Sequence, residues 1–257
     1  MGAPENIHAG IRELHAKTNH WGWVDGMYLG GNDDGIALRL HNGVCYEVES
    51  RKLWASLCKD AELVVDVGAH TGVYSLDAWN SGAKMVLSVE PYHLNYARLV
   101  MNLRHAGFIT DNTVYCAISN VDGIGILNID SHSYYCSTGG KVGVQENGQK
   151  VGMQYPVNVR RLDTLLNTNE HAKVRAVKID TESHGKQVLL GMQKILEHRP
   201  DLILECIEPG MGELLKPLGY KFYKIHETKG LSLVDDLIPD DPFTFDSPNR
   251  YATVKEL

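Results

Sequence analysis

The chain has 257 residues, enough for one large domain or for a core with small additions. Its 43% hydrophobic and 22% charged residues are ordinary for a globular protein, and its 25 glycines follow no period, which excludes collagen-like and disordered classes. The 25 basic and 32 acidic residues give a formal net charge of −7, and such a surface repels phosphate backbones. Composition therefore argues against nucleic acid as a partner.

Two further features concern the compartment. The five cysteines contain no CxxC pair, and their odd number is typical of reduced thiols. No stretch approaches the roughly 18 apolar residues of a membrane span, and the first residues lack the apolar segment of a secretion signal. We therefore predict a cytoplasmic protein without a membrane partner.

Residues 1–61 are predicted to form an N-terminal cap of helix, hairpin and helix. Apolar side chains recur at helical spacing within residues 4–18. Residues 35–49 alternate apolar and polar side chains around Asn42-Gly43, a dipeptide that favours two-residue hairpin turns. The cap by itself predicts no chemistry.

From residue 62 onward, short apolar runs alternate with helical stretches, a pattern typical of parallel βαβ units. We predict one α/β domain over 62–257 with a mostly parallel, seven-stranded, Rossmann-like sheet. Strands are expected at ELVVDVG, KMVLSVE, NTVYCAISN, VRAVKID, DLILECIE, KFYKIHE and NRYATVKE, and helices over 71–81, 91–107 and 185–198 and at MGELLKPLGY.

Irregular segments are expected at 130–155, which is polar and Gly-rich, and at 232–247, which is acidic and contains proline. Between the strands, GIGILNID is expected as an excursion rather than a crossover. The tryptophans are interpreted either as packing the cap onto the core or as walls of a binding site. Candidate wall residues are His132, Tyr134, Tyr135, Trp21, Trp23 and Tyr28.

The segment ELVVDVGAHTGVYSL leads from an apolar strand into a glycine-bearing turn and then a helix. Ligands of open α/β sheets bind at the carboxyl ends of the strands, near the point where the strand order reverses. Gly68 and Gly72 lack a Cβ and so permit close approach of the backbone to a ligand. The DxGxxxG spacing differs from the GxGxxG of dinucleotide sites, and Asp66 would repel a pyrophosphate.

A second acid, Glu90, ends the next strand, and Pro91 follows it at a natural first helical position. An acid in this place reaches both hydroxyls of a ribose. Each feature alone is equally well explained as a tight turn or a helix cap. The two together favour a nucleoside site.

Six segments in this order resemble the S-adenosylmethionine-dependent methyltransferases of the FkbM type: VVDVGAHTG, SVEPYHLNYARLVMNL, CAISNVDG, RRLDTLL, VKIDTESHGKQVLLGM and LILEC. The similarity covers about residues 62–225. The resemblance implies a class I methyltransferase fold and S-adenosyl-L-methionine as the cofactor. It also implies O-methylation of a hydroxyl on a sugar, a polyketide or another small polar acceptor.

The resemblance assigns cofactor contacts residue by residue. The methionine-binding turn matches Asp66, Gly68, His70, Thr71 and Gly72, with His70 where Asn is common. Glu90 matches the ribose acid, and the adenine is expected beside Pro91, Tyr92, Ala117 and Ile118. Asn95 and Asn102 match asparagines of the following helix, where a cap or surface role is the alternative.

At the methyl-transfer end, the family block KIDVEGAE reads KIDTESHG in this chain. His184 is the first candidate for a catalytic base, since the ~6.5 pKa of an unperturbed histidine suits proton transfer. The alternative is a solvent-facing histidine at a helix start. Asp180 is expected to orient the acceptor or to contact the methionine end of the cofactor. Glu182 is expected to bind acceptor hydroxyls, as is Glu205, which matches an acid ending the fifth strand.

Several alternatives remain open from the sequence. Asp180, Glu182, His184 and Glu205 could converge on Mg²⁺ or Ca²⁺, but DxExH is not a recognised ligand pattern, and no metal is predicted. A non-catalytic S-adenosylmethionine or nucleotide sensor, an NAD-dependent oxidoreductase and a nucleic-acid methyltransferase are the competing functions. A basic strip would serve the last of these: Arg160, Arg161 and Lys173.

Overall fold

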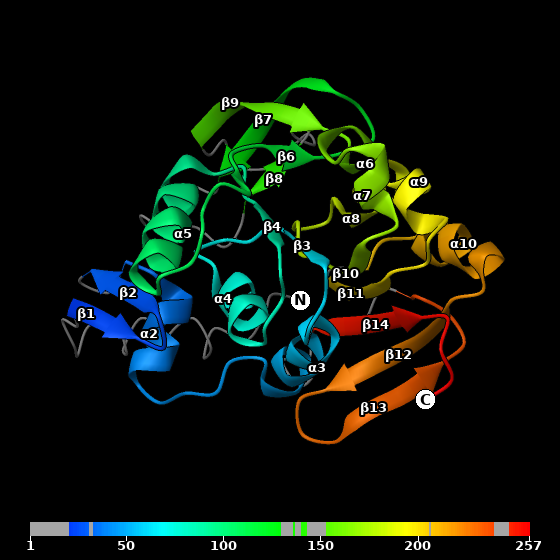
Figure 1. The fold of residues 1–257 in the computed structure, drawn as a ribbon, viewed down its shortest axis with the longest axis horizontal. Helices are drawn as coiled ribbons and strands as arrows, with labels where there is room; N and C mark the ends of the chain where they lie inside the picture. Colours follow the sequence, from blue (N-terminus) through cyan, green and yellow to red (C-terminus); the bar gives the residue numbers. More distant parts are fainter. Residues whose placement is uncertain are drawn as a thin grey trace, which may run out of the picture.

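A computed structural model describes residues 21–30, 33–129, 136, 140–142, 153–205, 207–238 and 247–257. The predicted helix over 4–18 lies outside them, as do His132, Tyr134, Tyr135 and most of the 130–155 loop. The described residues form three layers, a central sheet with helices on both faces, and a smaller sheet beside them (Figure 1).

The parallel part of the central sheet confirms the predicted βαβ pattern. Its strands run in the order β11-β10-β3-β4-β5, so the strand order reverses between β3 and β10. A ligand site is therefore expected above the carboxyl ends of these two strands. The bounds are β3 (Leu63–Val67), β4 (Val86–Val89), β5 (Thr113–Val114), β10 (Val174–Ile179) and β11 (Asp201–Glu205).

The remaining strands correct the predicted number. β14 (Asn249–Thr253) runs antiparallel between β11 and β12 (Lys221–His226), and β13 (Gly230–Val234) pairs antiparallel with β12 at the edge. The described sheet thus has eight strands instead of seven. The loop predicted from residue 232 was wrong at its start, because a short turn after His226 lets Gly230–Val234 fold back as a hairpin.

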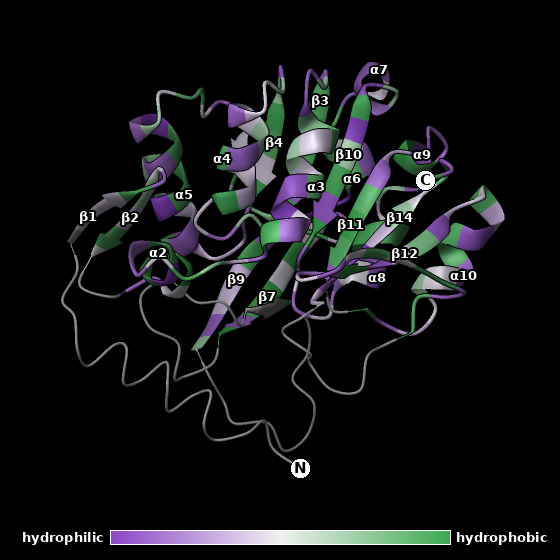
Figure 2. Ribbon diagram, turned by 90° about the horizontal axis from the view of Figure 1, so that it is seen from below, coloured by the Kyte–Doolittle hydropathy of each residue, from purple (hydrophilic) through white to green (hydrophobic). Residues whose placement is uncertain are grey.

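Both faces of the central strands are buried, with successive side chains on opposite faces. One face packs on α6 (Leu162–Leu165), α8 (Gly185–Leu190), α9 (Gln193–Leu196) and α10 (Met211–Leu215), with α7 (Thr168–His171) and the 3₁₀ turn η1 (Lys216–Leu218) nearby. The other face packs on α3 (Val48–Cys58), α4 (Val73–Asn80) and α5 (His93–His105). Figure 2 shows the hydrophobic strands β3 and β4 between these helices.

The helix predicted over 185–198 is instead two short helices, α8 and α9. The chain passes Ser119 at Gly191, where an added Cβ would lie 1.9 Å from the Ser119 carbonyl oxygen. This close approach of two backbones replaces continuous helix with a turn.

The excursion predicted for GIGILNID is confirmed, and it forms a strand of the smaller sheet. Its order is β6-β9-β7-β8, with β6 parallel to β9 and β7 antiparallel to both its neighbours. The bounds are β6 (Ala117–Ile118), β7 (Gly123–Ile129), β8 (Lys141–Val142) and β9 (Met153–Arg160).

The hairpin predicted at Asn42-Gly43 is wrong. Residues Gly35–His41 form helix α2, because Asp34 caps it by accepting hydrogen bonds from the Ile36 and Ala37 amides at 2.9 and 3.1 Å. A hairpin does occur earlier, where β1 (Trp21–Val24) and β2 (Met27–Gly30) pair antiparallel.

Helix α5 anchors this hairpin to the core. Arg98 pairs with Asp33 at 2.7 Å and donates to the Tyr28 carbonyl oxygen at 2.9 Å. The Trp23 ring stacks on His105 with 3.5 Å between centroids. For Trp23, the interpretation as cap packing therefore fits better than a binding-site wall. Among the helices of the described residues, none combines the length and the apolar character that a membrane span requires.

Candidate functional site

The turn after β3 uses positive φ at Gly68, His70 and Gly72, at +80°, +51° and +105°. An added Cβ at Gly68 would lie 1.7 Å from the Asp180 carbonyl oxygen, and one at Gly72 would lie 2.7 Å from a Leu99 methyl. Both glycines thus permit close packing within the protein. The turn consequently lies directly against the end of β10, where Asp180 donates its backbone N–H to Val67 at 2.9 Å.

Glu90 lies beside the same turn with 5% of its surface exposed. Its carboxylate accepts hydrogen bonds from the His70 and Tyr92 amides, each at 2.9 Å, and from the Asn95 side chain at 3.4 Å. Burial nevertheless raises the pKa of Glu90 to about 7, although these donors act to lower it. The carboxylate is thus held next to the turn while its charged form is only partly compensated.

Asp66 lies deeper than Glu90, with 1% exposed. It accepts a hydrogen bond from Ser75 of α4 at 2.6 Å, and Ser75 in turn lies 2.8 Å from Ser88 of β4. Burial raises the pKa of Asp66 to about 6, against the opposing effects of Ser75 and of the Lys178 charge. Asp66 therefore supports the floor of the site, and a direct contact with the cofactor stays a prediction.

Asp180 lies beyond the end of β10, with Lys178 on the strand below it. The Lys178 Nζ lies 3.3 Å from Asp180 and 3.5 Å from Glu205, which ends β11. This lysine has 1% of its side chain exposed, and Nζ lies 4.9 Å from the Tyr74 ring centroid. Burial acts to lower the Lys178 pKa, but the charges of Asp180 and Glu205 outweigh it and raise the pKa. Lys178 therefore stays charged inside the protein.

The pKa values of the two acids in this cluster change in opposite directions. Burial and the Asp180 charge raise the pKa of Glu205 well above its usual value. Burial also acts to raise the pKa of Asp180, but Lys178 and a hydrogen bond from Glu205 lower it below its usual value. These directions favour Glu205 as the hydrogen-bond donor of the pair and Asp180 as the acceptor.

The predicted cofactor residues and Asp180 belong to one electrostatic cluster. Asp180 acts to raise the pKa of both Asp66 and Glu90, and His70 acts to lower the pKa of Asp180. Thr71 is fully buried and its hydroxyl lies 3.1 Å from the His70 Nδ1. The structure thus brings together the residues predicted for the methionine and ribose ends.

His184 is held in a different environment. Its Nε2 lies 2.9 Å from the Ser119 hydroxyl, directly after the Ala117-Ile118 strand. Burial lowers the pKa of His184, and Glu208 is the charged group that opposes this change. His184 is therefore placed with the predicted adenine strand, whereas Asp180 pairs with Lys178 and Glu205. Glu182, at φ +50°, is half-buried in the turn between them.

The residues predicted around the adenine are mostly packed inside the protein. Tyr92, Ala117 and Ile118 have 2%, 3% and 2% exposed. Tyr92 and Ala117 share an apolar cluster with residues of β7 and β9, while Ile118 packs toward the central core. Pro91 is half-buried between Glu90 and Tyr92. The second sheet therefore backs the predicted adenine wall.

Three contributors to the site could not be recognised from spacing. Tyr46 and Glu47 stand ahead of α3, and the Glu47 carboxylate accepts a hydrogen bond from the Tyr74 hydroxyl at 2.5 Å. Glu47 also acts on the pKa of Lys178 and of Glu205. A lysine inside the apolar run VRAVKID was a usable signal for a buried ion pair, but no local pattern singled out Tyr46, Glu47 or Tyr74.

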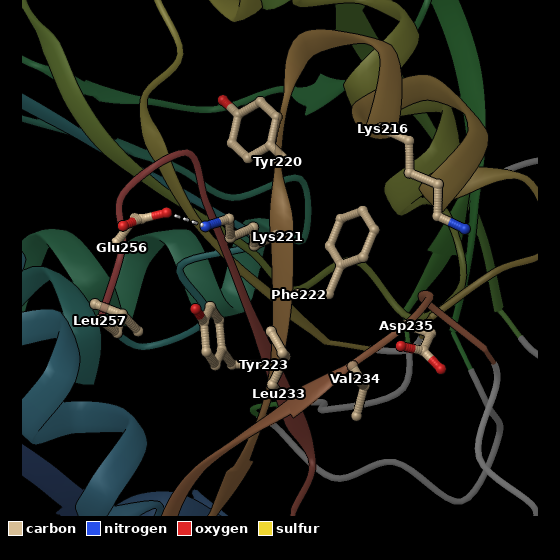
Figure 3. A pocket seen from close by; sticks show the side chains of 10 residues that line it. All are labelled: Lys216, Tyr220, Lys221, Phe222, Tyr223, Leu233, Val234, Asp235, Glu256 and Leu257. Carbon is tan, nitrogen blue, oxygen red and sulfur yellow. Dashed lines mark hydrogen bonds and ion pairs between the residues drawn. The ribbon is translucent and has the colours of Figure 1, made fainter.

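A surface pocket of about 480 Å³ lies elsewhere, between β12, β13 and the last residues of the chain (Figure 3). Lys221, which lines it, begins β12, and β12 runs parallel to β11 because both are antiparallel to β14. The pocket thus lies at the amino ends of the parallel strands, opposite the edge that carries Asp180 and Glu205.

Among the described residues, no three His, Cys, Asp or Glu side chains are arranged to hold a metal ion.

Comparison with known families decides the class of this site. The family described as the methyltransferase FkbM domain matches residues 66–222. The chain belongs to the FkbM methyltransferase family. The matched segment contains Asp66, Gly68, Glu90, Lys178 and Asp180, so the cluster described above lies within the family's own domain. This FkbM protein is an S-adenosylmethionine-dependent methyltransferase with S-adenosyl-L-methionine as its cofactor.

Solved structures show distant likeness to this methyltransferase. An S-adenosylmethionine-dependent methyltransferase from Agrobacterium tumefaciens is 14% identical, with 90% of this chain and 68% of that chain covered and a TM-score of 0.46. A precorrin-6y C5,15-methyltransferase from Geobacter metallireducens GS-15 is 13% identical over 80% and 88%, with a TM-score of 0.43. An rRNA methylase from Streptococcus thermophilus is 13% identical over 81% and 95%, with a TM-score of 0.42.

No curated protein matches the sequence.

The residues of this site fit the cofactor. A ribose would donate two hydroxyl hydrogen bonds, and the Glu90 carboxylate, with its raised pKa of about 7, is an acceptor short of such donors. The turn from Gly68 to Gly72 lies beside it, and the small apolar pair Ala117-Ile118 lies on the side of the second sheet. Glu90 would thus hold the ribose, and Ala117 and Ile118 would contribute apolar surface on the side of the base.

Proposed function

We propose that this methyltransferase transfers a methyl group to a hydroxyl of a small polar acceptor. The acceptor would bind at the carboxyl ends of β10 and β11. The observation that supports this is the ionised Asp180 carboxylate, held by Lys178 and Glu205 against the Gly68 turn. When bound, S-adenosylmethionine supplies an electrophilic methyl group on its sulfonium.

Asp180 would orient the acceptor and receive its proton. A carboxylate oxygen accepts the hydrogen bond of the acceptor hydroxyl and directs the hydroxyl oxygen toward the methyl-transfer point. The hydroxyl becomes strongly acidic as its oxygen gains the methyl group, so even a carboxylate with a lowered pKa can then take the proton. The Lys178 charge and a hydrogen bond from Glu205 hold the pKa of Asp180 below its usual value, which favours the ionised carboxylate before the reaction.

His184 is the alternative base. Burial lowers its pKa, so the ring is neutral at pH 7 and chemically able to accept a proton. Its Nε2, however, is engaged with the Ser119 hydroxyl at 2.9 Å. We therefore place His184 in support of the adenine strand and assign the proton-accepting role to Asp180, with Glu182 in the turn beside it as a further acceptor contact.

The residues of the basic strip form ion pairs with acids, and this favours a small acceptor over nucleic acid. Arg160 and Arg161 both bond to Asp122, at 3.2 and 3.1 Å, and Lys173 bonds to Glu62 at 2.9 Å. Each of these cations faces an acid, which reduces the positive field available to a phosphate backbone.

The described cysteines, Cys45, Cys58, Cys116 and Cys136, are free thiols, which supports the proposed cytoplasmic location.

The test is a turnover assay of S-adenosylmethionine against sugars, polyketides, simple polyols and RNA, with and without a chelator. We expect Asp180→Asn to lower kcat about 100-fold or more, since a general base typically contributes ~10²–10⁴-fold, with cofactor affinity unchanged within about threefold. His184→Ala should retain most of the turnover. A turnover of Asp180→Asn close to wild type would disprove the role of Asp180, and transfer to RNA alone would disprove the small acceptor.

A further inference from the structure

The segment ahead of α3 lies outside the matched family domain, which begins at residue 66, yet it enters the carboxylate cluster. We propose that Tyr46 and Glu47 form a wall of the acceptor site. Glu47 there selects an acceptor rich in hydrogen-bond donors, a neutral polyol or amino polyol, over a phosphorylated or carboxylated one. This assignment rests on the proposed function and names its substrate class.

Glu47 is held in place by residues of α4 and β14 and by its neighbour Tyr46. It adopts φ +43° and ψ +49°, a left-handed conformation that a residue with a Cβ seldom takes without a local reason. Its Oε2 accepts hydrogen bonds from the Tyr74 hydroxyl of α4 at 2.5 Å and from Asn249 of β14 at 2.8 Å. Tyr46 is also hydrogen-bonded to it. The carboxylate is therefore fixed beside the ends of β10 and β11.

Glu47 is not needed to cap α3, although it stands at the N-cap position. Its side chain makes no capping bond. Glu227, from the turn after β12, accepts hydrogen bonds instead, from the Glu49 amide at 2.7 Å and from the Ser50 amide and hydroxyl at 3.3 and 2.6 Å. Because a distant acid satisfies the helix start, the orientation of Glu47 toward the cluster has no capping role to explain it.

The charge of the cluster sets the class of acceptor. Four acids, Glu47, Asp66, Asp180 and Glu205, act on the one lysine, so the cluster holds more acidic groups than cations. Lys178 is buried with 1% of its side chain exposed, whereas Asp180 and Glu205 have 26% and 14%. An arriving acceptor thus meets carboxyl oxygens before it meets the cation. Hydroxyl or ammonium donors satisfy these oxygens, while an anion is repelled.

Three compounds with one carbon skeleton test this preference: glycerol, its amino analogue serinol, and glycerol 3-phosphate. Binding is followed by NMR of ¹³C-labelled tyrosine rings, with the cofactor saturating. We expect glycerol and serinol to shift the Tyr46 signal and to bind at least about tenfold more tightly than glycerol 3-phosphate. Glu47→Gln should reduce this discrimination at least about fivefold while the cofactor affinity stays unchanged.

Glu49→Gln is the matched control, since Glu49 lies on the same helix turn and pairs with the exposed Lys52 at 2.7 Å. Thermal unfolding of each variant shows whether it folds. If Glu47→Gln does not fold, Tyr46→Phe, which removes one hydroxyl from the wall, should weaken serinol binding. Preference for the phosphate, unchanged discrimination in the variants, or no shift with any compound would overturn the assignment. Binding without methyl transfer to any hydroxyl would instead overturn the proposed function.

Discussion

We expect Glu90 to make the affinity for the cofactor depend on pH. Burial raises the pKa of this carboxyl to about 7, and two ribose hydroxyls would hold it lower in the complex. A group whose pKa falls on binding favours binding when it is ionised, so affinity is full above about pH 7 and decreases as the pH falls through this value.

Calorimetry from about pH 6 to about pH 8.5 measures this dependence. We expect the affinity of the wild type to fall by up to about tenfold per unit below pH 7. Glu90→Gln should bind at least about tenfold more weakly at pH 8 and show no such slope, because an amide does not titrate. An equally flat profile in the wild type would contradict the assignment of Glu90 to the ribose.

Alanine substitutions at Gly68 and Gly219 distinguish the stability cost of backbone strain from that of steric overlap. Both adopt positive φ, at +80° and +87°, but an added Cβ lies 1.7 Å from the Asp180 carbonyl oxygen at Gly68 and meets nothing within 4 Å at Gly219. Gly219→Ala should cost about 1–2 kcal/mol of unfolding free energy from the left-handed conformation alone. Gly68→Ala should cost clearly more and also lower cofactor affinity. Chemical denaturation measures the unfolding free energy of the two variants, and calorimetry measures their cofactor affinity. Equal losses of unfolding free energy would argue against a steric overlap at Gly68.

The sequence predicted the individual residues of the turn and Glu90, because the turn and Glu90 each come directly after the end of a strand. Their neighbours were less predictable. His184 is close to Asp180 along the chain, and the sequence therefore predicted that the two side chains share one site. The turn through Glu182 and Ser183, at φ +50° and +69°, instead brings the His184 ring to the Ser119 hydroxyl. Glu47 could not be identified, since its partners Tyr74 and Asn249 lie far away along the chain.

Helix α5 couples the β1-β2 hairpin to the turn after β3 through one buried side chain. Asn102 donates to the Thr71 carbonyl oxygen at 2.7 Å and accepts from the Tyr28 amide at 3.1 Å. Asn102→Ala should cost about 1–3 kcal/mol, since two hydrogen bonds at ~0.5–1.5 kcal/mol each are lost.

Hydrogen exchange provides a sharper measurement than stability. We expect the variant to exchange faster both in residues 27–30 and in residues 68–72, because one side chain holds the two segments. Arg104→Ala is the control on the same helix, where Arg104 makes an exposed bond to Thr110 at 3.3 Å. Faster exchange in the hairpin alone would show that the turn is held by other contacts.

Elements with strong local signals were predicted well, and those that depend on distant contacts were not. The apolar runs of β3, β10 and β11 determine strands because burial on both faces demands continuous hydrophobic residues. The apolar pattern over 35–49 is also compatible with a helix, and the Asp34 cap stabilises helix α2 rather than the predicted hairpin. The break between α8 and α9 depends on Ser119 from another part of the chain.

The cap and the sheet share one hydrophobic core. Trp54 and Met27, both fully buried, belong to the same cluster as Val64, Ala176 and Ile203 of the central strands. The predicted division at residue 61 would therefore cut through a packed interior. The fragment 62–257 would expose this face to water, at a cost of ~25 cal/mol for each Å² of apolar surface.

We accordingly expect the fragment 62–257 to aggregate or to lack the near-ultraviolet circular dichroism of packed aromatic side chains. The full chain should unfold in a single calorimetric transition in which the calorimetric and van't Hoff enthalpies agree. A soluble fragment with a cooperative transition would show that the cap is an independent unit.

The α/β class, the family, and the turn with its two acids could be predicted from the amino-acid order, because these depend on local apolar periodicity and on residues adjacent in the chain. Which charged groups meet depends instead on how the chain packs. Lys178, Asp180, Glu205 and Glu47 come from three separate segments, and their protonation depends on burial and on short distances between them. The reason is physical: a pKa in the interior is set by the groups that packing brings near, and one sequence pattern is compatible with many such arrangements.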